Sequence, residues 1–332
     1  MRLVRLTSSE VTAARIAGRV LTHDVAHGLR KGTVLEARHV EALRALPEIH
    51  MVELDEGDLH EDDAAARLGA AIVGPGTQLQ GPVQSQVRVV SEHRGLLRVA
   101  RAAVDELNRL PAVGVFTLVD GQAVEAGEEV AGAKVTPVAV AGSLIAEAER
   151  IAAEAEPVLR VEPFQPLRTV VVVTERLKPK ARQAFAEAVT RKLGWYGAEL
   201  VAIREVARSG EAVRAAYEEA RRLDAGVILF AGASSIDPLD AAYAQLAAAG
   251  GELLRQGAPA HPGSMLWLGR LGHAVVLGVA SCAGFGRNTS LDLVLPYVFA
   301  YGEADALDFN RLGYGGLIEA GAGRRFPAYP ER

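Results

Sequence analysis

The feature that most constrains this fold is a change of pattern near residue 160. From Thr169 to Val173 the chain is a threonine followed by a run of valines, which is typical of a strand covered on both faces. Further strands are expected at 200–204 and 226–230, with a hairpin over 264–277. Helices are expected between them, at 180–196, 211–223, 239–256 and 291–301, the third interrupted by Gly250 and Gly251. Alternating strands and helices predict an α/β fold, a three-layer parallel sheet over 166–303.

Residues 1–160 have a different pattern and are expected to form a β-rich region with short helices. Strands are expected at 83–90, 96–99, 114–119 and 130–140, and helices at 35–46 and 141–155. The prolines within 161–166 indicate a stiff extended linker. Residues 304–332 are expected to form a short C-terminal tail. A chain of 332 residues is long enough for two or three such parts.

Composition excludes several classes of protein. Hydrophobic residues make up 49% and charged residues 23% of the chain, as in globular domains. Since no apolar run reaches the ~20 residues of a membrane span, no membrane partner is expected. The net charge of -5 disfavours non-specific nucleic-acid binding. Cys282 is the only cysteine, so an intrachain disulfide is excluded and a cytoplasmic location is expected.

The segment from Ala231 to Asp240 predicts a ligand site where a strand gives way to a helix. Small residues let a ligand approach the backbone, and their N–H groups can hold an anion. These anion-binding candidates are Gly232, Ala233, Ser234 and Ser235. Asp237 and Asp240 are candidate catalytic groups that could hold Mg²⁺ beside a phosphate, or accept from a ligand's amino groups. The alternative is a simple connection in which an Asp caps the helix.

Two further segments should lie at the same edge of the sheet, because each follows a predicted strand. Arg176, Lys178 and Lys180 could neutralise a phosphate, or form a solvated basic turn. The glycine-bearing loop before the last helix adds Ser281, Cys282, Arg287 and Asn288 as candidate ligand contacts, against a plain solvated loop. Cys282 is more often a small buried residue than a reactive one in such a place.

The acidic run over 53–63 does not have the spacing of a calcium loop, and a solvated loop explains it more simply. The histidines show no zinc pattern. The chain also has neither a phosphate-binding Walker loop nor the serine elbow of a hydrolase. These observations leave the predicted sheet edge as the candidate site.

The order of these elements resembles the molybdopterin-binding family, which includes MoeA-like molybdopterin molybdenumtransferases and MogA-like adenylyltransferases. The loop at 231–240 matches the family's first loop, with an Asp shortly after it. His261-Pro262-Gly263-Ser264 stands where the family has Lys-Pro-Gly-Lys, and both Lys positions are changed. The chain is most similar to the MoeA-like half of bacterial fusions with a nucleotidyltransferase, a branch with Gly-Cys-Ala where this chain has Ser281-Cys282-Ala283. The resemblance covers about residues 10–318.

The resemblance implies a function in molybdenum cofactor biosynthesis. It implies molybdopterin or the mature cofactor as ligand, with His261, Pro262 and Gly263 at the site. It also implies Mg²⁺ and ATP or AMP as cofactors if the chain transfers adenylyl groups or inserts molybdenum. A homodimer formed through the N-terminal region is expected, with a molybdenum enzyme or a nucleotidyltransferase as further partner. The changed Lys positions favour an alternative, a non-catalytic carrier of the cofactor. A sensor domain for another phosphorylated small molecule is the other alternative.

Overall fold

The computed structural model describes residues 1–25, 28–155, 157–233, 235–280 and 288–318. The chain divides into two compact units, Met1–Glu162 and Pro163–Arg332. Among the described residues, every helix is too short or too polar to cross a membrane.

The first unit is rich in short strands. Its strands are β1 (Arg2–Thr7), β2 (Val20–Leu21), β3 (Glu48–Glu53), β4 (Asp58–His60), β5 (Thr77–Val83), β6 (Gln86–Ser91), β7 (Gly95–Val99), β8 (Val113–Thr117), β9 (Ala123–Val124), β10 (Glu129–Val135), β11 (Ala139–Ala141) and β12 (Leu159–Pro163). Its helices are α1 (Ala13–Ile16), α2 (Val40–Arg44), α3 (Glu61–Ile72), α4 (Arg101–Leu107) and α5 (Gly142–Ala155), with 3-10 turns at Ser8–Glu10 and Ala37–His39.

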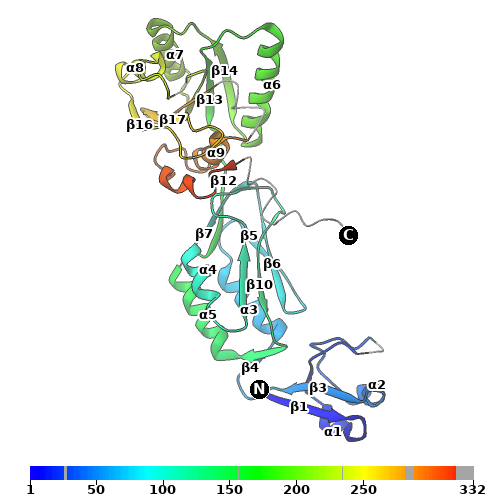
Figure 1. The fold of residues 1–332 in the computed structure, drawn as a ribbon. Coiled ribbons are helices and arrows are strands. Elements are labelled where there is room, and N and C mark those ends of the chain that lie inside the picture. The colour runs from blue at the N-terminus through cyan, green and yellow to red at the C-terminus, as the bar shows by residue number, and fades with distance from the viewer. Residues whose placement is uncertain (26–27, 156, 234, 281–287, 319–332) are drawn as a thin grey trace. The chain divides into compact units, whose positions relative to one another are not determined.

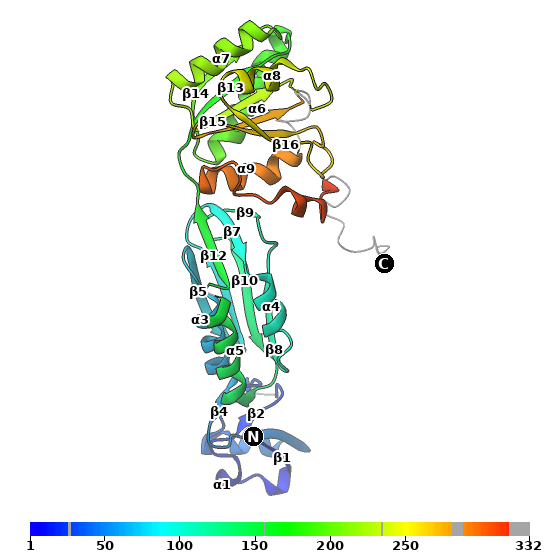
Figure 2. The ribbon, with the colours of Figure 1, turned by 90° about the vertical axis from the view of Figure 1, so that its left-hand side faces the viewer.

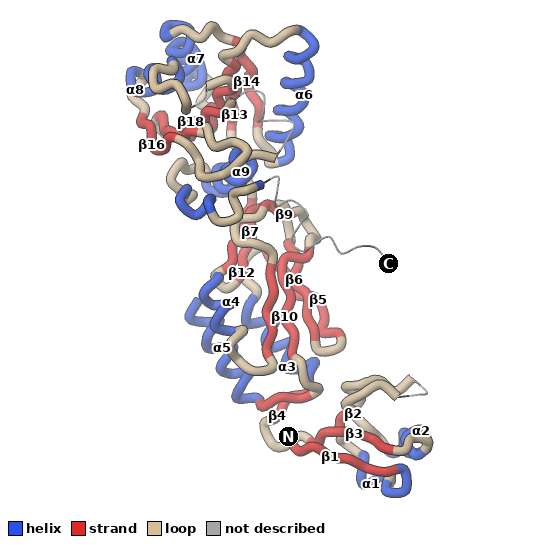
Figure 3. Tube along the Cα trace, viewed as in Figure 1, coloured by secondary structure: helices blue, strands red, loops and turns tan. Residues whose placement is uncertain are grey.

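Helix α3 packs on the sheet of order β5-β6-β10-β8 and against α5. Figure 3 shows β5, β6 and β10 side by side, with α3 and α5 next to them. Apolar residues of α3, including Leu68 and Ile72, share one buried cluster with Val87 and Val89 of β6. The smaller sheet of order β1-β3-β2 has a separate core around Leu6, which is fully buried.

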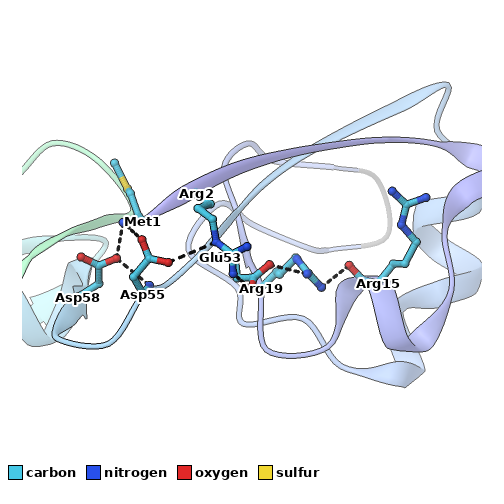
Figure 4. Close-up of polar contacts among 7 residues, drawn as sticks. All are labelled: Met1, Arg2, Arg15, Arg19, Glu53, Asp55 and Asp58. Carbon is cyan, nitrogen blue, oxygen red and sulfur yellow. Dashed lines mark hydrogen bonds and ion pairs between the residues drawn. The ribbon is translucent and has the colours of Figure 1, made fainter.

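A network of polar contacts between charged residues lies along β1 and β3 (Figure 4). It consists of Met1, Arg2, Arg15, Arg19, Glu53, Asp55 and Asp58. Glu53 is its centre, because its carboxylate accepts from Arg2 and, at 2.5 Å, from Arg19. Arg19 also donates to the backbone oxygen of Arg15 at 2.6 Å. The amino group of Met1 pairs with Asp55 at 2.8 Å and with Asp58 at 2.6 Å.

The second unit contains a six-stranded sheet of order β14-β13-β15-β18-β17-β16. The strands are β13 (Arg168–Val173), β14 (Glu199–Glu205), β15 (Val227–Ala231), β16 (Glu252–Gln256), β17 (Trp267–Leu271) and β18 (Ala274–Val279). The helices are α6 (Pro179–Trp195), α7 (Gly210–Arg222), α8 (Ala241–Ala248) and α9 (Ser290–Tyr301), with a 3-10 helix η3 (Phe309–Gly313). Strands β14, β13, β15 and β18 are parallel, and β17 and β16 are antiparallel to their neighbours.

Alternate valines of β13 show that the sheet is covered on both faces. Val171 and Val173 lie in a buried cluster with residues of α6 and α9. Val170 and Val172 lie in the opposite cluster with residues of α7 and α8. Successive side chains of a strand point to opposite faces, so an unbroken apolar run requires both layers of helices. Figures 1 and 2 show α6 on one side of the sheet and α7 and α8 on the other. The predicted three-layer α/β fold is confirmed.

One predicted element is wrong in its second half. The helix expected over 239–256, with an interruption at Gly250 and Gly251, ends at Ala248, and residues 252–256 form the edge strand β16. Gly250 has φ of +81°, which stops the helix, and a Cβ on Gly251 would lie 2.3 Å from Leu246. The strand expected over 83–90 is confirmed over residues 86–90, which belong to β6, but its first residues lie in the end of β5 and in the turn of a hairpin of β5 and β6. Its turn uses positive φ at Gln84 and Ser85, residues that carry no turn signal of their own.

Other predicted boundaries shift. The strand expected over 130–140 is split into β10 and β11, and the helix expected over 35–46 is reduced to a 3-10 turn and the short α2. The expected linker at 161–166 begins as strand β12, which pairs with β7. The predicted hairpin closing the second unit is confirmed as the pair of β17 and β18.

Candidate functional site

The candidate site is the edge of the second sheet where its parallel strands end. Strands β14, β13, β15 and β18 run in one direction, so the segments that follow them leave the sheet at one edge. These segments begin at Thr174, Val206, Gly232 and Ala280. Ligands of open parallel sheets bind at this edge. Arg176 and Gly232 follow the neighbouring strands β13 and β15, and the sequence predicted that their segments lie at the same end of the sheet.

The loop after β15 is held by its own chain. The N–H of Gly232 donates to Val279 at 2.9 Å, and the N–H of Ser235 donates to Met265 at 3.0 Å. These two N–H groups are therefore already used within the chain, and ligand contact by residues 232–235 stays a prediction. Gly232 is required for a second reason: its φ is +93°, and a Cβ would lie 2.7 Å from the Glu175 side chain. Ala233 is buried beside it.

Trp267 fixes the same loop from the other side. Its indole Nε1 donates to the backbone oxygen of Ala233 at 3.0 Å, and its side chain is fully buried. The indole lies against Phe230 and, edge to face, against Tyr243 with centroids 5.2 Å apart. A buried indole N–H needs an acceptor, so the loop carbonyl and the tryptophan stabilise each other.

The two candidate aspartates have different environments. Asp240 is only 2% exposed. It is the N-cap of α8, where its Oδ1 accepts from the N–H of Ala242 at 2.8 Å, and its Oδ2 accepts from Arg208. Asp237 is exposed and lies before the helix, where its Oδ1 accepts from the N–H of Leu239 at 2.9 Å. Asp240 thus caps the helix, as in the alternative interpretation of the sequence. The second carboxylate oxygen of Asp237 remains available for a ligand.

Arg208 was not singled out from the sequence. It follows β14 and donates to Asp240. The hydrogen bond to Asp240 raises the pKa of Arg208, and the nearby charges of Asp237 and Glu175 raise it further. Burial, followed by the charge of Asp240, raises the pKa of Tyr243. The position of Arg208 in the sequence could have indicated its role, since Arg208 follows a predicted strand just as Arg176 does.

No group of three or more metal-ligating side chains occurs within the ranges that the structure describes. The Asp240 carboxylate is already occupied by Arg208 and by the helix N–H. A Mg²⁺ site at Asp237 and Asp240 therefore stays a prediction. It would require Arg208 to leave Asp240.

The basic segment after β13 keeps its charges free. Arg176, Lys178 and Lys180 are exposed, and within the described chain none of them forms an ion pair. Lys178 is the N-cap of α6 and Pro179 is its first residue, with no side-chain cap and no acidic residue in the first turn. The N-terminus of a helix attracts anions. Three free cations and an uncapped helix start therefore coincide at this edge.

The turn at His261, Pro262 and Gly263 is built against α9. The N–H of Ser290 donates to Pro262 at 2.9 Å, and the Ser290 hydroxyl donates to Gly263 at 2.6 Å. Gly263 has φ of +106°, and a Cβ there would lie 2.4 Å from the Ser290 Oγ. His261 is exposed, and its backbone pairs with residues 316–318. The side chain of His261 is therefore free to meet a ligand, while the turn itself is structural.

Four candidate residues lie outside the described residues: Ser234, Ser281, Cys282 and Arg287. Asn288 is described and exposed, just before Thr289, which caps α9. The candidate contact at Asn288 remains a prediction.

No family model and no curated protein matches the chain. Among solved structures, it is similar to the molybdopterin biosynthesis enzyme MoaB of Thermus thermophilus, with 18% identity and a TM-score of 0.30 over 40% of this chain and 91% of that chain. The molybdopterin biosynthesis protein MoeA of Pyrococcus horikoshii is 13% identical, with a TM-score of 0.32 over 74% of this chain and 80% of that chain.

The molybdopterin biosynthesis Mog protein of Mycobacterium ulcerans is 12% identical, with a TM-score of 0.27 over 40% of this chain and 93% of that chain. These names belong to the family that the sequence motifs resemble. All three TM-scores lie below 0.5, so the function must be inferred from the residues of this chain.

Proposed function

We propose that the second unit binds a phosphorylated pterin, molybdopterin or the mature molybdenum cofactor, and that the chain serves molybdenum cofactor biosynthesis or maturation. One observation carries the proposal. The cations Arg176, Lys178 and Lys180, which form no ion pair within the described residues, lie at or just before the uncapped start of α6, at the edge where the parallel strands end. The order of motifs along the sequence supplies the identity of the ligand.

The phosphate of such a ligand would lie at the start of α6. Lys178 and Lys180 would supply charge, and the first N–H groups of the helix would donate to phosphate oxygens. This replaces the loop 232–235 as the main phosphate contact, because the N–H groups of Gly232 and Ser235 are used within the chain. The loop then serves as a rigid wall, held by Trp267.

The pterin ring carries amino groups that need acceptors. Asp237 is exposed and has an oxygen without a partner in the described chain, so it is assigned as the acceptor. Asp240 and Arg208 form a pair beside it. This pair holds the start of α8 in place, and it would have to separate before Asp240 could hold Mg²⁺.

A carrier of the cofactor is favoured over a transferase by two observations. Asp240 caps α8 and pairs with Arg208, and His261 and Ser264 replace the two lysines of the family signature. Molybdenum insertion or adenylyl transfer would need Mg²⁺ and ATP or AMP at this edge. A transferase would consume ATP with Mg²⁺ when pterin is added, and a carrier would not. The homodimer and the partner enzyme remain proposals.

Titration with molybdopterin, followed by pterin fluorescence, tests the binding proposal. The double variant Lys178→Ala and Lys180→Ala should weaken binding by about tenfold or more, because hydrogen bonds to charged groups contribute about 1.5–3 kcal/mol each. The control is Arg222→Ala. Arg222 is an exposed arginine near the end of α7, at the opposite edge of the same sheet. Equal affinity in the double variant and in the control would contradict the proposal.

A further inference from the structure

A pocket lies between α6 and α9, away from the basic segment. Its volume is about 290 Å³, and its lining residues are Ala188, Arg191, Lys192, Trp195, Tyr196 and Asp292. Lys192 is in the second half of α6, roughly 18 Å along the helix from Lys180 at 1.5 Å per residue. Small-molecule sites start at about 300 Å³, so the pocket has room for one small ligand. It is separate from the proposed phosphate site.

One side of the pocket is an ion pair. The Nζ of Lys192 lies 2.7 Å from Oδ1 and 2.9 Å from Oδ2 of Asp292. The same carboxylate accepts from the N–H of Thr289 at 2.8 Å. Because the Lys192 ammonium pairs with Asp292, the negative charge of this carboxylate is largely offset, and its repulsion of an anion in the pocket is reduced.

The hydroxyl of Tyr196 is the second polar group of the pocket. Tyr196 is 7% exposed and lines the pocket, yet its hydroxyl makes no hydrogen bond within the described chain. Burial, followed by the charge of Asp292, raises the pKa of Tyr196, so the hydroxyl keeps its proton. The hydroxyl oxygen is not among the fully buried unpaired atoms of the described residues, so it is accessible to solvent at the pocket. An acceptor atom of a ligand could therefore take its hydrogen bond.

The remaining polar group is the guanidinium of Arg191. It is exposed and forms no ion pair within the described residues, so the lining carries a net positive charge. Trp195 forms an apolar wall, with its ring set edge to face on Tyr196 at 4.9 Å and 82°. A guanidinium, a phenol hydroxyl and an aromatic wall together match a flat ligand with a carboxylate.

We propose that this pocket binds a small planar carboxylate, an aromatic acid. The carboxylate lies between the Arg191 guanidinium and the Tyr196 hydroxyl, and the ring lies against Trp195. This site depends on α6 and α9 alone and is independent of pterin binding at the sheet edge.

Isothermal titration of the full chain with benzoate tests the proposal. Two comparison ligands separate the contribution of the carboxylate charge from that of the planar ring. Cyclohexanecarboxylate has the charge without the planar ring, and benzyl alcohol has the ring without the charge. Benzoate should bind most tightly, with each comparison ligand weaker by about tenfold, which corresponds to one lost interaction of this kind.

Two variants identify the site. Arg191→Ala removes an exposed, unpaired charge, and Tyr196→Phe removes only a hydroxyl while keeping the ring that stacks on Phe299 at 5.1 Å. Each should weaken benzoate binding about tenfold, with unfolding midpoints unchanged. Arg222→Ala should bind benzoate like the parent chain. The proposal is overturned if benzoate does not bind, if benzyl alcohol binds equally well, or if both pocket variants keep full affinity.

Discussion

Trp267 and Gly278 lie opposite each other across the antiparallel pair of β17 and β18. A Cβ on Gly278 would lie 1.8 Å from the indole Nε1, so only glycine lets the ring lie over the neighbouring strand. From there the indole reaches the carbonyl oxygen of Ala233 at 3.0 Å. A glycine in one strand therefore sets the shape of the loop that follows another.

Gly278→Ala should destabilise the second unit. The added methyl would displace a fully buried tryptophan, and overpacking of this kind costs about 1–3 kcal/mol or more. Urea unfolding followed by tryptophan fluorescence measures the effect.

Gly194→Ala is the matched control. Gly194 lies in α6, and a Cβ there would meet no atom within 4 Å. Since alanine is favoured over glycine in a helix by about 1 kcal/mol, this variant should be as stable as the parent chain or more stable. Equal losses at the two positions would refute the role given to the Trp267 contact.

Asp240 should contribute to stability through two separable interactions. Asp240→Asn keeps a good helix cap but removes the charge that pairs with the half-exposed Arg208, at a cost of about 1 kcal/mol. Asp240→Ala also removes the cap of α8, at a further cost of about 1 kcal/mol. Thermal unfolding of both variants measures the two steps.

Asp237→Asn is the comparison, because Asp237 is exposed. It should change the free energy of unfolding by no more than about 0.5 kcal/mol, yet weaken binding of the pterin. If Asp237→Asn destabilised the chain as much as Asp240→Ala, the division of roles between the two aspartates would be wrong.

Glu10 should make the first unit sensitive to acid. The N–H of Thr7 is the largest cause, followed by the Thr7 hydroxyl and Arg15, and together they lower the pKa of Glu10 from 4.5 to about 2. Since the folded pKa is below the unfolded one, the stabilisation is present above pH 4.5 and is lost as pH falls toward 2.

The variant Glu10→Gln should therefore be less stable than the parent chain at neutral pH, with the difference closing between pH 4.5 and 2. Unfolding across this range, together with an NMR titration of the Glu10 carboxyl, measures both effects. A Glu10 carboxyl that titrates near 4.5 in the folded chain would contradict the assignment.

The layers of the second unit could be predicted because its signal is local. The valines of β13 are buried on both faces of the sheet, and an unbroken run of valines is compatible with few structures other than a strand covered on both faces. The edge strand β16 could not be predicted, since its residues follow an alanine-rich helix and become a strand only by pairing with β17. The turn at Gln84 and Ser85 was missed for a similar reason: positive φ at those residues depends on the hairpin around them.

The candidate site was predicted in position but not in detail. Strand order places Arg176, Arg208 and Gly232 at one edge, which a sequence can indicate. Which N–H groups remain free depends on distant partners such as Val279 and Met265, and a sequence does not show them. The pairing of Arg208 with Asp240 joins residues 32 positions apart, so it too becomes visible only in the folded chain.

The most direct test of the central claim is mass spectrometry of the small molecules that co-purify with the chain from cells making molybdenum enzymes. We expect a phosphorylated pterin on the parent chain. We also expect that this pterin is lost from the variant lacking Arg176, Lys178 and Lys180 and retained by Arg222→Ala. Pterin binding at the start of α6 is wrong if the parent chain carries no pterin or if the triple variant retains it in full.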